Sequence, residues 1–162
     1  MQLCGAIKNK YDDEQINARP QEILIDVIGI GAGVVDRLSE QNLPVRGVNV
    51  SESPSTKTNY LNLRAELWFL IRDWLAGRDV RIPDDDGLVA ELSSPIYKYT
   101  STGKIKIESK EDMRKRGIKS PDKADALALT MASVGASFSG NKDAFMGYNF
   151  RKPLKSKIYR VG

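Results

Sequence analysis

The strongest constraint on the fold is a strand, glycine turn, helix and strand that follow one another early in the chain. Residues 22–29 are mostly apolar and β-branched apart from Glu22 at the start and Asp26 within the run, which suits a strand covered on both faces. Gly29-Ile-Gly-Ala-Gly ends that strand, residues 34–42 have the pattern of a short amphipathic helix, and residues 44–50 have that of a second strand. This order predicts two parallel strands joined by a right-handed crossover, in the α/β class.

Periodicity predicts the remaining elements of a single domain. Apolar residues recur every three or four positions from Tyr60 to Ala76, and a Ser-Pro pair at 120–121 opens a helix that runs to about Val134. Alternating residues on both sides of Ser101-Thr-Gly predict a β-hairpin. Weaker signals predict a helix before residue 17, a strand stub at 80–83, a helix capped by the aspartates at 84–86 and a helical turn at 110–116.

The amino-acid content limits the chemistry. The 162 residues include no histidine and one cysteine, Cys4. The chain therefore has no His-based nucleophile pair, no His-ligated or Cys₄ zinc site and no disulfide within the chain. Hydrolytic chemistry would have to use carboxylates, lysines or hard metal ions bound by oxygen ligands.

The net charge of +4 is concentrated near the C-terminus. From Ser139 to Gly162 there are six basic residues, among them Arg151 and Lys152, and one acid. We predict a domain over residues 1–138 and a flexible basic tail over 139–162, which either contacts a phosphate backbone or is a solvated end without a partner. No apolar run is long enough to span a bilayer, so no membrane association is expected.

Three aspartates are candidate site residues. Asp26 interrupts an apolar strand near its carboxyl end, where open α/β sheets bind ligands, and the alternative is a structural Asp that accepts the turn amides. Asp125 interrupts a small apolar helix face, and Asp122 precedes it in the first turn, where a carboxylate also suits the helix dipole without any function. Carboxylates from a strand end and a helix start can share two divalent ions for phosphodiester cleavage.

Two further motifs have competing interpretations. The glycine turn after residue 28 is an imperfect match to a dinucleotide-binding turn, because Val34 stands where the third glycine belongs. Lys104, Lys106 and Lys110, on and after the hairpin, either contact DNA phosphates or form an exposed sheet face.

Three segments together resemble the C-terminal nuclease domain of phage terminase large subunits. They are Ile25-Asp-Val-Ile-Gly-Ile-Gly-Ala-Gly-Val-Val-Asp, Tyr60-Leu-Asn-Leu-Arg-Ala-Glu-Leu-Trp, and the stretch 108–127 that closes on Ser-Pro-Asp-Lys-Ala-Asp-Ala-Leu. The resemblance covers roughly residues 1–135. It implies an RNase H-like fold and cleavage of concatemeric viral DNA during genome packaging, with three acids and two Mg²⁺ or Mn²⁺ ions.

Carried over to this sequence, the resemblance assigns Asp26 as the second acid and Asp125 as the third, with Asp122 as a further candidate ligand. The first acid of the family lies on an opening strand that has no counterpart here, since Asp12 and Asp13 fall in a polar helical stretch. These 162 residues also contain no P-loop motif of the kind that the ATPase domain of the family carries. We therefore expect an incomplete RNase H-like mixed sheet with flanking helices, from a prophage remnant or a truncated piece of a terminase.

The missing first acid and its strand have two expected consequences. With two of three acids, nuclease activity of the chain alone should be weak or nil, and the alternative is a non-catalytic DNA- or partner-binding remnant. Without its neighbour, the first strand has an open edge, which favours self-association. The resemblance further implies double-stranded DNA as substrate, contact with portal and small terminase subunit, and location in the bacterial host cytoplasm.

Overall fold

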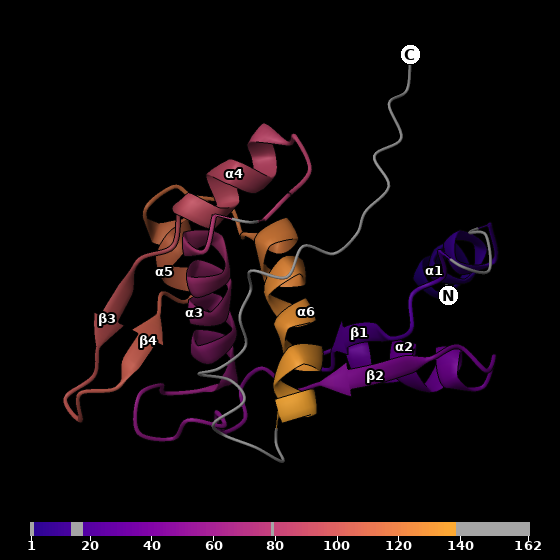
Figure 1. Ribbon diagram of the computed structural model, residues 1–162, viewed down its shortest axis with the longest axis horizontal. Helices are drawn as coiled ribbons and strands as arrows, with labels where there is room; N and C mark the ends of the chain where they lie inside the picture. The colour runs from indigo at the N-terminus through magenta and orange to yellow at the C-terminus, as the bar shows by residue number, and fades with distance from the viewer. Residues whose placement is uncertain (1, 14–17, 79, 139–162) are drawn as a thin grey trace.

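The computed structural model describes residues 2–13, 18–78 and 80–138 as six helices and four short strands (Figure 1). In chain order the elements are α1 (Gln2–Asp13), β1 (Ile23–Asp26), α2 (Gly31–Ser39), β2 (Val45–Val48), α3 (Leu63–Ala76), α4 (Asp86–Ser93), β3 (Tyr97–Tyr99), β4 (Ile105–Ile107), α5 (Lys110–Lys115) and α6 (Asp122–Phe138).

The early βαβ unit is confirmed. Strands β1 and β2 pair in parallel, with Ile23 opposite Val45 and Asp26 opposite Val48. The two faces of β1 are covered by different helices, as its continuous apolar run predicted. Ile23 and Ile25 pack with the cluster formed by α1 and α2, whereas Leu24 packs with the larger cluster that includes α6.

The turn between β1 and α2 depends on a glycine at position 31. A Cβ atom at this position would lie 1.7 Å from the carbonyl oxygen of Asp26, so no side chain fits there. Gly29 has φ +74°, which a glycine adopts without strain. The close approach brings the start of α2 directly against the end of β1 and fixes the backbone of Asp26.

The main hydrophobic core lies around α3. Figure 1 shows α3 and α6 side by side, and these two helices pack against each other. Asp85 accepts a hydrogen bond from the Leu88 amide at α4, as expected for the aspartates at 84–86. Asn62, which was not predicted as a cap, accepts one from the Ala65 amide at α3. The most buried residues of this core come from α3, α6, β2, α4 and β4, among them Ala65, Leu67, Ile71, Val48, Leu88, Ile107 and Ala124.

The hairpin predicted around Ser101 is confirmed as β3 and β4, which pair antiparallel. The segment from Asn59 to Leu61 lies along the other side of β4, because the Leu61 amide donates to Ile105 and the Ile105 amide donates to Asn59. This contact fixes the hairpin to the N-terminal end of α3.

Some boundaries differ from the predictions. Residues 80–83 contain no strand, α3 begins at Leu63 rather than at Tyr60, and α6 continues to Phe138 instead of ending near Val134. The predicted basic tail, including Arg151 and Lys152, lies outside the described residues. Each of the described helices is too short or too polar to cross a membrane.

Candidate functional site

Asp125 is the most strongly contacted carboxylate among the predicted site residues. It sits in the first turn of α6, and its side chain is 21% exposed. Its Oδ1 atom accepts hydrogen bonds from Trp68 Nε1 at 2.9 Å and from Arg64 Nη2 at 3.1 Å and Nε at 3.2 Å. Two side chains of α3 therefore hold this carboxylate in one orientation beside the core.

Arg64 and Trp68 were not among the residues predicted from sequence. They are four residues apart on α3 and so share one face of that helix, where Arg64 also lies over the indole ring of Trp68 at 5.9 Å. The Arg64 Nη1 atom donates to the carbonyl oxygen of Glu108 at 2.8 Å. Arg64 thus links α3, α6 and the end of β4 around the Asp125 carboxylate.

Lys110 lies between the two predicted acids of α6. Its Nζ atom is 3.3 Å from Asp125 Oδ2 and 3.5 Å from Asp122 Oδ1. Asp122 is exposed, and a hydrogen bond from the Ser120 hydroxyl, helped by Lys110, lowers the pKa of its carboxyl group. Lys110, predicted as a DNA contact, is here the second cation that balances Asp125.

Asp26 differs from the expectation of a carboxylate inside an apolar strand. It is the last residue of β1 and is exposed, and its Oδ1 atom accepts a hydrogen bond from the Ile28 amide at 3.0 Å. The turn after the strand therefore closes on Asp26 itself, as the structural alternative predicted. The same contact takes up an amide of the glycine turn, which makes a dinucleotide phosphate a poor fit there.

The side chain of Asp26 lies on the face of β1 that packs against α6. Alternate residues of a strand share a face, so Glu22, Leu24 and Asp26 point the same way. Glu22 accepts a hydrogen bond from the hydroxyl of Ser133 on α6, and Leu24 lines a hollow of about 660 Å³ together with Ala126 and Thr130. Asp26 therefore lies in line with Glu22 and Leu24, on the face of β1 that runs along α6.

The described residues contain no ready-made metal cluster. Within residues 2–13, 18–78 and 80–138, no three Asp, Glu, His or Cys side chains are grouped closely enough to hold a metal ion. The exposed Asp26 carboxylate is an oxygen ligand of the kind that Mg²⁺ and Mn²⁺ take. Asp125 fits this role only if a metal ion replaces Lys110 at its Oδ2 atom, which also accepts a hydrogen bond from Arg64 Nη2 at 3.4 Å.

The hairpin lysines lie apart from these acids. Lys106 is exposed on β4, and Lys104 precedes it in the turn, where its backbone pairs with Thr100. The structure places both on the same two-stranded ribbon, as predicted. Their contact with DNA stays a prediction.

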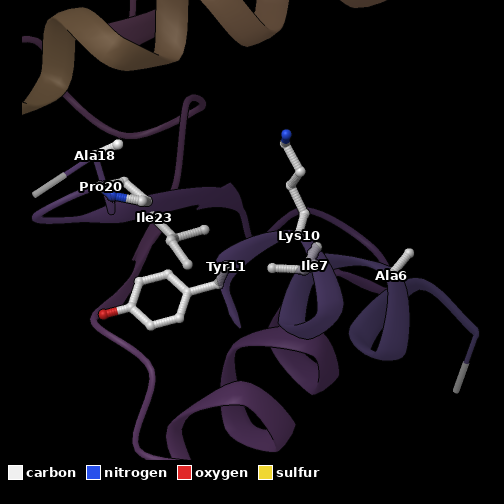
Figure 2. Close-up of a pocket in the computed structure, with 7 residues that line it drawn as sticks. All are labelled: Ala6, Ile7, Lys10, Tyr11, Ala18, Pro20 and Ile23. Atoms are coloured by element: carbon white, nitrogen blue, oxygen red, sulfur yellow. The ribbon is translucent and has the colours of Figure 1, made fainter. Parts of the chain in front are cut away.

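A second hollow, of about 510 Å³, lies between α1 and the entry to β1 (Figure 2). Ile7 and Tyr11 of α1 line it opposite Pro20 and Ile23, and Lys10 is the only charged side chain among its lining residues. This lining is apolar and offers no set of groups for hydrolysis. It is better suited to an apolar side chain than to a polar substrate.

Comparison with known proteins connects this geometry to one kind of domain. No family profile and no curated protein matches the sequence. Among solved structures, the nuclease domain of the large terminase subunit gp2 of bacterial virus Sf6 matches with a TM-score of 0.59 and 25% identity, over 78% of this chain and 67% of that one. The chain has the fold of a terminase nuclease domain.

Two further structures of the Sf6 domain match as well. The K428A mutant with manganese has a TM-score of 0.60 and 24% identity, covering 78% of this chain and 68% of that chain. The same mutant with calcium has a TM-score of 0.59, again at 24% identity and over 78% of this chain. The resemblance expected from the sequence is confirmed, as a mixed α/β fold similar to this nuclease domain.

Proposed function

We propose that this chain is a divalent-metal-dependent DNA endonuclease domain of the terminase type, with Asp26 and Asp125 as metal ligands. The observation that carries the proposal is the position of these two carboxylates. Asp26 ends a strand on the face that packs against α6, and Asp125 stands in the first turn of α6. The match to the Sf6 nuclease domain, which has been solved with manganese and with calcium, supports a nuclease that uses a divalent metal ion.

The chemistry proposed is hydrolysis of a phosphodiester bond in double-stranded DNA. Bound Mg²⁺ or Mn²⁺ would supply an activated water and stabilise the leaving oxygen. Arg64 and Trp68 keep Asp125 oriented by donating to its Oδ1 atom, and its Oδ2 atom faces Lys110 and accepts a longer hydrogen bond from Arg64 Nη2 at 3.4 Å. Asp122, at 77% exposure, is the further candidate ligand and would compete with Asp125 for Lys110.

We propose weak nuclease activity for the chain by itself. Asp26 and Asp125 are two carboxylates where the resemblance implies three, and the described residues contain no group of three. Fewer carboxylates mean a lower affinity for divalent ions and less neutralisation of the ions' charge.

We extend the proposal to contacts with the substrate and with partners. We infer that Lys104 and Lys106, together with Arg151 and Lys152 of the basic tail, contact the DNA backbone, since lysine and arginine neutralise phosphates. Contact with portal and small terminase subunit, and location in the host cytoplasm, belong to this proposal as properties of a packaging nuclease.

The test combines metal binding with cleavage. Mn²⁺ is titrated into the chain by calorimetry, and nicking of supercoiled plasmid is assayed in the same buffer, with wild type, Asp26→Asn and Asp125→Asn. Asp36→Asn, which changes an exposed acid on α2, is the matched control. We expect binding and nicking to fall together in the first two variants and to be retained in the control.

The second candidate is a non-catalytic DNA-binding remnant. It is favoured by the ion pairs of Asp125, which already balance that carboxylate without a metal ion. DNA binding that needs no divalent ion, with no nicking by wild type and unchanged Mn²⁺ binding in Asp26→Asn, would establish this alternative and contradict the nuclease proposal.

A further inference from the structure

The β3–β4 hairpin carries two chemically different faces. Its register places Tyr97 opposite Ile107, Lys98 opposite Lys106 and Tyr99 opposite Ile105. Because successive residues of a strand point to opposite sides, all four aromatic and aliphatic side chains share one face. The other face carries Lys98 and Lys106, and Lys104 joins them by its pairing with Thr100.

The lysine face has little acid to balance it. Lys98 and Lys106 are directly opposite each other, an arrangement of like charges that destabilises a β-ribbon. Neither Lys98 nor Lys104 forms an ion pair with any of the residues that the structure describes. Lys106 helps to lower the pKa of the Asp112 carboxyl group, but the Ser109 hydrogen bond and Lys115 contribute more to that shift. A polyanion would relieve this repulsion.

The aromatic face is exposed although it is fixed to the core. Tyr97 is 52% exposed and Tyr99 is 67% exposed. Their rings meet edge to face at 6.0 Å, and Tyr97 in turn meets Phe69 of α3 at 5.3 Å. Arg72 lies over the Phe69 ring at 4.2 Å. The two tyrosines thus form an aromatic surface that contacts α3 through Phe69, and Arg72, which is paired with Asp73, lies at its base.

The outer edge of the hairpin belongs to β3. Strand β4 is covered on its far side by residues 59–61, and Figure 1 shows β3 on the outside of the molecule, away from α6. A ligand that runs along this edge meets Tyr97 and Tyr99 on one side and Lys98 on the other. The lysine in the middle of the edge opposes pairing with another β-strand.

We propose that the edge of β3 binds single-stranded DNA, with unpaired bases on Tyr97 and Tyr99 and the phosphate backbone beside Lys98 and Lys106. Aromatic side chains stack on any base whose face is free, and the bases inside a duplex are not free. This inference rests on the proposed DNA substrate. It adds that the part of the DNA bound at β3 is single-stranded, at a frayed end or a locally opened duplex. It requires no metal ion.

Binding is measured by fluorescence anisotropy of a dye-labelled oligothymidylate, with a duplex of the same length in parallel and EDTA present. For the single strand, Tyr97→Ala/Tyr99→Ala should weaken binding roughly tenfold or more, with the salt dependence retained. Lys98→Ala/Lys106→Ala should reduce the slope of log affinity against log salt by about 0.7 per lysine. Tyr97→Phe/Tyr99→Phe keeps the rings and should bind like wild type.

Three results would overturn the proposal: an unchanged single-strand affinity in the Tyr-to-Ala variant, an equal loss for single strand and duplex, or a loss in the Tyr-to-Phe variant. If the Tyr-to-Ala variant does not fold, as judged by circular dichroism, the test is the salt dependence of single-strand binding by Lys98→Ala/Lys106→Ala. An unchanged slope of log affinity against log salt would then overturn the proposal. Failure of plasmid nicking with tyrosine-dependent oligonucleotide binding intact would contradict the nuclease proposal alone.

Discussion

Among the described glycines, Gly31 is the one at which the surrounding backbone leaves least room for a side chain. Its missing Cβ would lie 1.7 Å from the carbonyl oxygen and 2.8 Å from the carbonyl carbon of Asp26, and neither backbone atom can move aside cheaply. Gly31→Ala should therefore lower the free energy of unfolding by about 2 kcal/mol or more, through a clash in a packed region. The measurement is urea denaturation followed by circular dichroism.

Gly33 is the matched control, because it lies in the same helix with nothing within 4 Å of its would-be Cβ. Gly33→Ala should raise the free energy of unfolding by roughly 0.5–1 kcal/mol, since alanine is the better helix former. Equal effects of the two substitutions would contradict the close contact at Gly31.

We predict that Lys110 competes with a metal ion for the carboxylate of Asp125. Its ammonium group lies 3.3 Å from Asp125 Oδ2, and Lys110→Ala removes that charge. We expect the affinity for Mn²⁺, measured by calorimetry, to rise about fivefold or more, in line with one charge pair at the surface. Lys115→Ala, on the same helix but paired with Glu111 and Asp112, should leave Mn²⁺ affinity unchanged. A fall in affinity for Lys110→Ala would mean that the lysine positions the carboxylate instead.

The sequence singled out Asp26 and Asp125 as candidate ligands, but it did not point to the side chains that contact Asp125. Asp125 stood out because a carboxylate interrupts the small apolar residues of α6. Its partners Arg64 and Trp68 are 61 and 57 residues away in the chain, so no local pattern connects them to it. The spacing of four between an arginine and a tryptophan on one helix was the available signal, and it becomes meaningful only once α3 and α6 are packed together.

Glu22 joins three elements through its carboxylate. It accepts hydrogen bonds from Arg46 on β2 and Ser133 on α6, and these hydrogen bonds, with Arg46 the stronger, lower its pKa from 4.5 to about 2. Because the folded pKa is below the unfolded value, the stabilisation is complete above about pH 4.5 and is lost as the pH falls toward 2.

Glu22→Gln should accordingly lower the urea midpoint at pH 7, and the difference from wild type should shrink progressively below pH 4.5. Glu40→Gln removes the partner of Arg37 in an exposed pair and should have little effect at either pH. A Glu22→Gln difference that stays constant from pH 7 to pH 3 would show that packing, and not the charge, is what Glu22 contributes.

Element types were predictable where a pattern was long or a turn was specific. The continuous run in β1, the glycine turn and the alternation around Ser101 each gave the right element. The prediction of a short strand at 80–83 was wrong. Four apolar and basic residues do not form a strand unless another strand lies beside them, and none pairs with this segment among the described residues. Whether a strand pairs depends on how the whole chain packs, so a local sequence pattern does not predict it.

At the scale of the whole molecule, two hydrophobic clusters meet at the small parallel sheet. The cluster of α1 and α2 packs on one face of β1 and β2, and the cluster centred on α3 and α6 packs on the other. In the described residues β1 pairs with β2 alone. Ile23 and Val27 donate to the backbone of β2, so the backbone groups of Leu24 and the amide of Asp26 point to the open edge, whereas the Asp26 carbonyl oxygen lies against Gly31.

We predict that this edge pairs with the β1 strand of a second copy. An antiparallel pair centred on Leu24 places Glu22 of one copy across from Asp26 of the other, so higher salt should favour the dimer by screening the two acids. Leu24→Pro removes an outward amide and also the side chain that packs against the main core, so its fold is first checked by circular dichroism. The folded variant should be a monomer in sedimentation velocity. Tyr97→Pro removes an outward amide from the other free edge, at β3, and should leave the dimer intact. A wild-type chain that stays monomeric at every concentration and salt tested would exclude the pairing, and loss of the dimer in Tyr97→Pro alone would move the interface to the hairpin.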